Sequence, residues 1–309
     1  MKVSANVAYS DYTSNGIISG TGTDRGGVIL SVINTPTYAP VWDPEKPGQY
    51  YNGFYGVNVN HPVENMARSE DNKNNSNRLI ATGNAEITFL PELKLKSSFT
   101  IDRDYNHTTE FLDPIKTTHG RNQGGTGKDE RSLSTVLVFD NILTYNKNFN
   151  KHGIDVMAGS SWTGSKWSKN YVNGQYYRDG SIHTLNAANK IPLNGAGSNA
   201  ADWAIMSYVG RVAYNYDSKY MVTVNMRADG SSKLHPDHRW GYFPSASAAW
   251  RISSENFMQD ITWINDLKLR GGWGQTGNQS GLGDYSYLML YNINRVEWWQ
   301  VGNEKAVPS

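Results

Sequence analysis

Apolar and polar side chains alternate in several stretches of this chain, and a period of two predicts β-strands with one apolar face. From Leu79 to Phe89 every second residue is apolar or small, and after a short turn, Leu90 to Glu92, the alternation resumes from Leu93 to Asp102. These two stretches predict an antiparallel hairpin. The same pattern predicts further pairs: Leu133 to Tyr145 with Ile154 to Trp162, Trp203 to Tyr216 with Tyr220 to Ala228, and Trp240 to Ile252 with Leu267 to Trp273.

Long connections separate the predicted hairpins, whereas the turns within them are mostly short. The long connections are rich in Gly, Asn, Pro and Tyr and cover Asp11 to Ser76, Asp104 to Arg131, Gly164 to Asp202 and the shorter Asp229 to His238. A compact soluble domain seldom contains several such loops. Bacterial outer-membrane barrels combine short periplasmic turns with long extracellular loops. With Met1 to Ser10 as a further strand, the chain is predicted to be all-β, an antiparallel transmembrane β-barrel segment with about nine strands in an incomplete barrel.

Aromatic residues gather beside the short turns, for example Phe89, Tyr145, Phe149 and Trp250. Amphipathic rings prefer a lipid–water boundary, so this clustering favours an aromatic girdle at the periplasmic end. Ordinary β-forming residues near hairpin ends would give the same clustering, and both interpretations stay open.

Composition is compatible with spanning strands and excludes spanning helices. The chain is 38% hydrophobic with a mean hydropathy of −0.60, and no stretch approaches the roughly 20 apolar residues that a spanning helix needs. A spanning strand needs only about ten residues, half of them apolar. The net charge of +1 offers no basic surface for nucleic acid, and the absence of cysteine excludes a disulfide scaffold and a thiolate metal site.

Residues 1–309 are predicted to form one partial barrel domain of a larger protein. Met1 to Ser10 alternates like a strand and lacks the apolar stretch and cleavage site of a signal peptide. Single-chain bacterial barrels close with an even number of strands, and the last residues, Lys305 to Ser309, resemble a loop. We therefore expect a signal peptide and C-terminal strands to lie outside this sequence.

An ordered series of short motifs between Tyr220 and Asn278 carries a family resemblance. The motifs are Arg227-Ala228-Asp229-Gly230-Ser231-Ser232, Arg239-Trp240-Gly241-Tyr242-Phe243-Pro244-Ser245, Ala249-Trp250-Arg251-Ile252-Ser253, Glu255-Asn256-Phe257, Leu267-Lys268-Leu269-Arg270 and Gly274-Gln275-Thr276-Gly277-Asn278. This series resembles the SusC/RagA family of TonB-linked (TonB-dependent) outer-membrane transporters, and six ordered pieces are far more specific than one motif. The upstream half is similar to the variable strands and loops of that family. Gly272-Trp273-Gly274 departs from the Ser-Tyr-Gly-like sequence common there.

The resemblance implies a transporter rather than an enzyme, with no cofactor, no catalytic residue and no metal. It implies active uptake of large nutrients, oligosaccharides or peptides, across the outer membrane of a Gram-negative, Bacteroidetes-type bacterium. A SusD-like lipoprotein would cover the external face, and outer-membrane lipid would surround the barrel. The TonB complex would act through a plug domain that we expect outside this sequence.

The signature residues also suggest local roles by their own chemistry. Asp229-Gly230-Ser231-Ser232 predicts a turn after a strand, in which the carboxylate caps backbone N–H groups and Gly230 takes a positive φ. Trp240 is expected to begin the next strand. Ser245 to Ala249 are small on both faces, which permits close approach of an object inside the barrel, and the resemblance implies that this object is the plug.

Candidate ligand-binding residues lie in the first long connection, namely the aromatic residues Trp42, Tyr50, Tyr51 and Tyr55. Flat amphipathic rings can stack on sugars or contact a partner. A long loop that packs against itself uses the same residues, and this alternative stays open.

Other motifs lack parts of the catalytic or metal sites that they suggest. His235 to His238 has no second cluster of metal ligands. Gly120 to Lys128 lacks the Ser or Thr that follows the lysine of a phosphate-binding loop. Nothing fixes the separation of the carboxylates of Asp102, Asp104 and Glu110 as a glycosidase requires.

Two other classes of protein stay open: a soluble carbohydrate-binding or carbohydrate-active β-sandwich, and a non-transport surface or adhesive protein.

Overall fold

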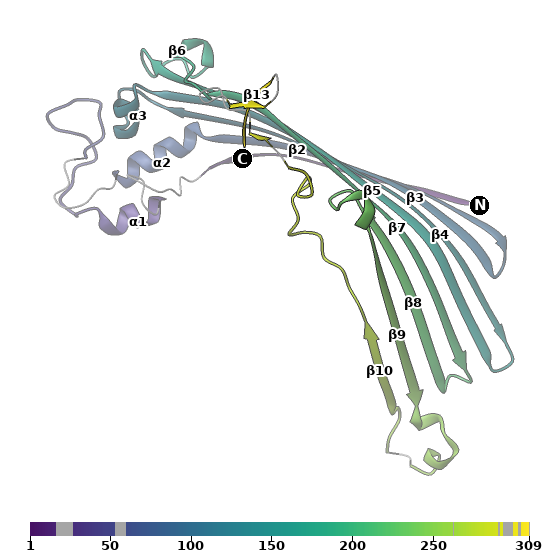
Figure 1. Ribbon diagram of the computed structural model, residues 1–309. Coiled ribbons are helices and arrows are strands. Elements are labelled where there is room, and N and C mark those ends of the chain that lie inside the picture. Colours follow the sequence, from purple (N-terminus) through teal and green to yellow (C-terminus); the bar gives the residue numbers. More distant parts are fainter. Residues whose placement is uncertain are drawn as a thin grey trace.

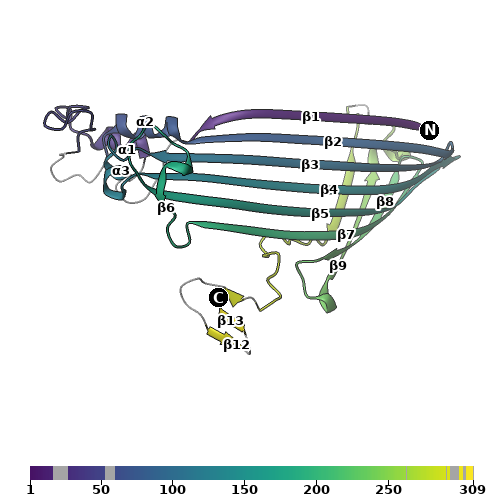
Figure 2. The same cartoon turned by 90° about the horizontal axis from the view of Figure 1, so that it is seen from above.

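The computed structural model describes residues 1–16, 27–52, 60–261, 263–289, 291–292, 299–301 and 304–308. Its main feature is one antiparallel sheet in the order β1-β2-β3-β4-β5-β7-β8-β9-β10, with β6 paired to β5. The sheet is a curved wall that does not close on itself (Figures 1 and 2), and the nine strands along it confirm the prediction. Their bounds are β1 Lys2–Asn15, β2 Lys73–Leu90, β3 Leu93–Leu112, β4 Thr126–Phe149, β5 His152–Tyr177, β6 Ala188–Lys190, β7 Ala196–Tyr216, β8 Tyr220–Ser231, β9 Trp240–Arg251 and β10 Lys268–Gly274.

Short elements lie outside this sheet. They are the helices α1 Gly27–Asn34, α2 Pro62–Asp71 and α3 Thr118–Gln123, the 3-10 turns η2 Leu185–Ala187, η3 Pro236–His238, η4 Ile252–Ser254 and η5 Asn256–Met258, and a small sheet of β11 Tyr291–Asn292, β12 Trp299–Val301 and β13 Glu304–Pro308. Within the described ranges, no helix is both long enough and apolar enough to cross a membrane.

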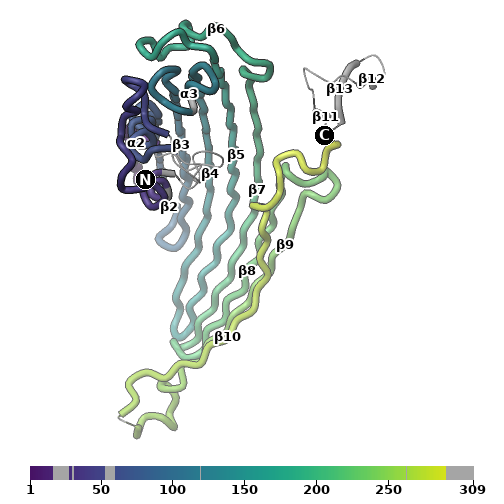
Figure 3. Tube along the Cα trace, turned by 90° about the vertical axis from the view of Figure 1, so that its left-hand side faces the viewer, coloured from purple at the N-terminus to yellow at the C-terminus, as the bar shows by residue number. Residues whose placement is uncertain are grey.

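The predicted hairpins are all present, and two of their turns use residues suited to them. Asn150 between β4 and β5, and Asp217 and Ser218 between β7 and β8, have φ angles of 52°, 51° and 56°. Tight hairpins favour this left-handed conformation, which Asn and Asp adopt more readily than most residues. The short turns lie at one end of the wall, whereas α1, α2, α3 and β6 lie at the other (Figures 1 and 3), as predicted. We call these the turn end and the loop end.

The strands continue further than their alternation predicted. At the turn end, β4 and β5 include most of the run from Asn146 to Gly153, and only Asn150 and Lys151 lie between them. At the loop end, β3, β4, β5 and β7 extend into connections that were predicted to be loops. In these extensions polar residues lie on both faces, and the apolar ones, such as the buried Phe111 and Tyr177, follow no alternation. The hydrophobic period therefore disappears although the ladder of backbone hydrogen bonds continues.

Residues paired in register share a face of the sheet, and the two faces differ in chemistry. Phe99, Phe139 and Trp162 form one row on the apolar face, and Tyr216 and Tyr220 lie in a second row near the turn end. Trp162 pairs with Met206, ten residues before Tyr216 on β7, which is roughly 33 Å along the strand. A tilt of about 40° reduces this to a height of roughly 25 Å, which matches the apolar band of an outer-membrane barrel.

The opposite face is polar. Asp140 of β4 accepts hydrogen bonds from Ser98 of β3 and Ser161 of β5. Thr82 and Thr100 form a similar cross-strand pair, 3.0 Å between their hydroxyl oxygens. The main sheet is a single layer with polar groups on one side, which differs from the two packed sheets of the β-sandwich alternative.

Candidate functional site

The signature motifs meet on the polar face around β8. Arg227 Nε donates to both carboxylate oxygens of Asp229, at 2.8 Å each, and Arg227 Nη2 donates to Ser207 Oγ at 3.0 Å. Ser207 of β7 stands opposite Asp229 in register and is 2% exposed. The prediction that Asp229 caps backbone N–H groups is therefore wrong, because its carboxylate forms an ion pair with Arg227 of the same strand.

The last motif packs against β9 beside this pair. Gln275 N donates to Pro244 O at 3.0 Å, and Gly274 pairs with Ser245 in register. Gly277 lies against the ring of Phe243, where a Cβ atom would overlap the ring. Gly241 is also close to this ring, at 2.7 Å for a Cβ atom. A cavity of about 570 Å³ opens here, and its lining includes Arg227, Asp229, Phe243, Ser245, Thr276 and Gly277.

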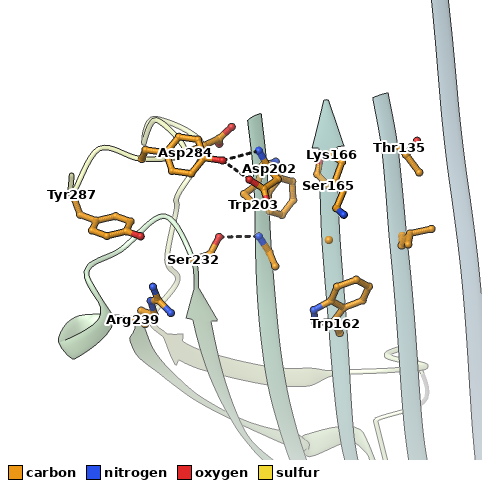
Figure 4. Close-up of a pocket in the computed structure, with 14 residues that line it drawn as sticks. Thr135, Trp162, Ser165, Lys166, Asp202, Trp203, Ser232, Arg239, Asp284 and Tyr287 are labelled. Carbon is orange, nitrogen blue, oxygen red and sulfur yellow. Dashed lines mark hydrogen bonds between the residues drawn. The ribbon is translucent and has the colours of Figure 1, made fainter. Parts of the chain in front are cut away.

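Serine and asparagine residues of the signature attach the chain beyond β8 and β10 to the sheet. Ser231 Oγ donates to Gln279 Oε1 at 2.5 Å. Ser232 N donates to Ala204 O at 2.9 Å, and Ala204 N donates to Ser232 Oγ at 2.8 Å (Figure 4). Asn278 Oδ1 accepts a hydrogen bond from Ser280 N at 2.9 Å and closes a local turn. These short polar side chains thus supply hydrogen-bond partners where the strands end and the backbone ladder stops.

Gly230 has a packing role on the apolar face. It pairs with Trp240 in register, and a Cβ atom at this position would lie 2.9 Å from the indole ring. That ring stacks on Tyr208, with ring centroids 5.8 Å apart. Gly230 does not have a positive φ, and β8 continues to Ser231. The predicted turn at this position is therefore wrong, whereas Trp240 begins β9 as predicted.

Trp250 belongs to a separate cluster at the turn end. Glu255 Oε1 accepts hydrogen bonds from Tyr220 Oη at 2.6 Å and Trp250 Nε1 at 3.1 Å, and Lys219 Nζ lies 3.4 Å from Oε2. The hydrogen bond from Tyr220, with those from Trp250 and Lys219, lowers the pKa of Glu255. This part of the signature holds the β7–β8 turn against the β9–β10 connection.

The candidate ligand residues separate into different environments. Trp42 and Tyr50 stack with centroids 4.5 Å apart, but Tyr50 is 7% exposed and Trp42 is 50% exposed. Tyr50 N donates to Lys116 O at 3.2 Å, and Tyr51 N donates to Val41 O at 3.1 Å. Burial raises the pKa of Tyr50. Tyr50 thus packs the connection against itself, one side of Trp42 remains open, and Tyr55 lies outside the described residues.

Sequence reasoning missed a buried polar cluster at the loop end. Glu64 of α2 is 0% exposed and accepts hydrogen bonds from Thr118 N at 2.7 Å and Thr118 Oγ1 at 2.9 Å. Burial raises the pKa of Glu64, although the Thr118 hydrogen bonds and Arg68 oppose this shift. Asn65 Nδ2 donates to Ser31 Oγ of α1 at 3.3 Å. The cluster joins segments that are far apart in sequence, and the only local signal was Pro62 at the start of α2.

Groups for metal or cofactor chemistry are not brought together in this part of the protein. Across the described ranges, no set of three or more His, Cys, Asp or Glu side chains could hold a metal ion. His235 precedes the exposed turn η3 and His238 is its last residue, with ring centroids 6.4 Å apart.

An unclosed antiparallel wall with one apolar and one polar face, short turns at one end and elaborated loops at the other, defines a segment of an outer-membrane-type β-barrel. No protein-family model matches the chain. The chain is 30% identical over 293 residues to the TonB-dependent receptor SusC of Bacteroides thetaiotaomicron, which covers 88% of this chain and 28% of that protein. It is 32% identical over 232 residues to the TonB-dependent receptor P39 of Formosa agariphila, which covers 74% of this chain and 22% of that protein.

A solved structure of the RagAB peptide transporter matches the fold with a TM-score of 0.77 and 20% identity, covering 99% of this chain and 34% of the matched chain. The predicted resemblance to TonB-dependent receptors of the SusC/RagA type is therefore confirmed. The chain spans about a quarter of the length of the curated relatives named above.

Proposed function

We propose that this chain forms part of the barrel wall of an outer-membrane TonB-dependent transporter that imports large nutrients, either oligosaccharides or peptides. The observation that carries the proposal is the two-faced wall, with an apolar band of roughly 25 Å between aromatic rows and hydrogen-bonded polar residues such as Asp140 on the other face. The apolar face meets lipid, and the polar face lines the interior.

The polar face around β8 and β9 supports contact with a plug domain supplied by another part of the protein. Ser245 and Ser247 point to this face together with Thr223 and Asn225, and such small side chains leave room for a closely packed partner. The signature cavity beside Arg227 is open on the same side. The plug would receive energy from the TonB complex.

At the loop end, a SusD-like lipoprotein would cover the external mouth. Trp42 is the best described candidate for contact with nutrient or lipoprotein, because half of its side chain is exposed above the buried Tyr50. Tyr51 and Tyr55 remain candidates in the same connection. An exposed ring supported by a second ring is a rigid stacking surface for a sugar or a peptide side chain.

A pair of adjacent substitutions tests which face meets lipid. Val224 lies on the apolar face between the aromatic rows, and Thr223 lies on the polar face opposite Ala213 and Ser247. In the full gene product, Val224→Arg is expected to cost about 2–4 kcal/mol and to remove the heat-modifiable barrel from outer-membrane fractions. Thr223→Arg would crowd the proposed plug contact, but it is expected to leave the heat-modifiable barrel in outer-membrane fractions because its charge faces the interior. Equal tolerance of both changes, or recovery of the wild type with soluble proteins, would refute the membrane location.

Uptake tests the transport step itself. Cells that carry the gene should accumulate a labelled oligosaccharide or peptide, and cells without this gene, the SusD-like lipoprotein or TonB should not. Correct insertion of the barrel without any nutrient whose uptake depends on the gene and TonB would support a non-transport surface protein instead.

A further inference from the structure

A second cavity, of about 280 Å³, opens on the apolar face beyond the end of β8. Its apolar base is formed by Leu137 and Trp162, whose ring extends over Gly164, 2.6 Å from where a Cβ atom would lie. Leu137 pairs with Gly164 and Thr135 pairs with Lys166, so these residues share the face that carries the row of Trp162. The cavity therefore lies just beyond the aromatic row, on the loop side of the apolar band (Figure 4).

The side chains that line the cavity carry more positive than negative charge that is left without an ion-pair partner. Lys166 is exposed and forms no ion pair with a described residue, and Arg239 donates from Nε to Leu234 O at 3.3 Å without a carboxylate partner in the described ranges. Of the two carboxylates in the lining, Asp284 is neutralised by Lys233, whose Nζ lies 2.9 Å away. Asp202 stands opposite Lys166 in register and accepts a hydrogen bond from Tyr285 Oη, which leaves its negative charge in place. Lys166 and Arg239 together therefore exceed the remaining carboxylate in charge.

Lys166 and Arg239 lie on opposite sides of the cavity, with Trp162 below Lys166 and about level with Arg239 (Figure 4). An anion placed between two cationic side chains gains charge-assisted hydrogen bonds from both. The indole of Trp162 adds a flat surface on which a sugar ring can stack. The lining thus combines a site for an anionic group with a site for a sugar.

The position of the cavity selects a lipid as the source of these groups. Lys166 lies four residues beyond Trp162 on β5, which is roughly 13 Å along the strand and about 10 Å in height after a tilt of about 40°. This places its ammonium group at headgroup level, where Lys and Arg extend along apolar surface while their charges remain in polar surroundings. The volume of about 280 Å³ suits one headgroup sugar, and acyl chains would continue along the apolar band beneath it.

We propose that this cavity binds the phosphorylated sugar headgroup of an outer-leaflet glycolipid, with Lys166 and Arg239 at the phosphate and Trp162 beneath the sugar. The inference rests on the proposed outer-membrane location. A bound lipid would fill the notch where β8 ends and β7 continues, and would stabilise the wall there.

The test uses the full gene product, extracted from outer membranes in mild detergent and freed of lipid. Native mass spectrometry measures binding of a purified phosphorylated glycolipid of the same bacterium and of its dephosphorylated form. The variants are Lys166→Gln with Arg239→Gln, Lys166→Gln alone, and the control Lys147→Gln. Lys147 is a cation on the same face at the turn end, where it lies 3.5 Å from Glu92. Heat modifiability confirms that each variant is folded.

We expect the double variant to bind the phosphorylated lipid about tenfold more weakly, and Lys166→Gln alone to show part of this loss, which keeps the test decisive if the double variant does not fold. The control should bind like the wild type, and the dephosphorylated lipid should bind the wild type as weakly as the double variant does. Equal affinity in all proteins, or displacement of the lipid by excess inorganic phosphate, would overturn the proposal. Absence of the wild-type protein from outer membranes would instead refute the proposed function.

Discussion

Arg227 and Asp229 form an ion pair within one strand, and the same guanidinium also reaches Ser207 of the neighbouring strand. The pair therefore joins β8 to β7 on the polar face. It also borders the cavity whose lining includes Phe243 of β9 and Gly277 of the last motif. Residues from three motifs thus meet at one place, which gives a physical reason for their occurrence together in the sequence.

Loss of this pair should weaken the wall measurably. In Arg227→Gln the partly buried carboxylate of Asp229 loses its charged donor, and we expect the free energy of unfolding to fall by about 1 kcal/mol. Thermal loss of the heat-modifiable band of the detergent-extracted protein measures this change. Arg251→Gln is the matched control because it breaks an ion pair, 3.0 Å long, whose carboxylate, Asp266, is more exposed than Asp229. This change should cost less than about 0.5 kcal/mol. Equal losses in both variants would contradict a specific role for Arg227.

Gly230 should tolerate no side chain. In Gly230→Ala the new Cβ would lie 2.9 Å from the Trp240 ring, and displacing that ring from Tyr208 should cost about 1–3 kcal/mol. Gly83→Ala is the control, since Gly83 also lies within a strand on the apolar face and a Cβ atom added there would meet no other atom within 4 Å. That change should be neutral or should stabilise the protein by up to about 1 kcal/mol. Similar melting temperatures for the two variants would show that the Trp240 ring moves freely.

The sequence allowed the hairpins and the two faces to be predicted because apolar and polar positions alternate within the apolar band. Val222, Val224 and Met226 of β8 are one clear example. The strand ends could not be predicted in this way. Glu130 and Lys169 hold β4 and β5 together beyond the band with an ion pair 3.0 Å long, and charged residues on both faces leave no hydrophobic period to detect.

The contents of the candidate site were only partly predictable. The motifs identified which residues belong together. They did not predict that Asp229 would pair with Arg227 within a strand, or that Gly277 would lie against Phe243. The buried Glu64 was missed because its partner, Thr118, lies 54 positions away. Contacts over such distances depend on the register of the strands between them, and a local pattern contains no information about it.

The loop end should become more stable as the pH falls. Burial raises the pKa of Glu64 above its ordinary value, so the folded cluster holds a proton that the unfolded segment releases. The stabilising contribution is complete below the ordinary pKa and is lost as the pH rises through the raised one. Hydrogen exchange of α2 and α3 measured from neutral to mildly acidic pH should show slower opening at the acidic end. Burial raises the pKa of Asp71 as well, and its contribution has the same sign.

Glu64→Gln should reduce this pH dependence, because the amide resembles the protonated acid and its oxygen can still accept from Thr118 N. The control is Glu70→Gln, a change at an exposed carboxylate on the same helix, which should leave the slope unchanged. If the slope persists in Glu64→Gln, another group must be responsible.

Trp42 and Tyr50 should differ in what their removal changes, although their rings are stacked. Tyr50 is buried, so Tyr50→Ala should open the first connection and speed its cleavage by a protease, at a local cost of about 3 kcal/mol. Trp42→Ala removes the half-exposed ring and should leave protease resistance nearly unchanged. Because stacking on an aromatic ring contributes about 0.5–1.5 kcal/mol, Trp42→Ala should weaken nutrient or lipoprotein binding roughly twofold to tenfold. Trp42→Phe should retain most of the binding. Unchanged binding in Trp42→Ala, measured by calorimetry, would assign both rings to loop packing alone.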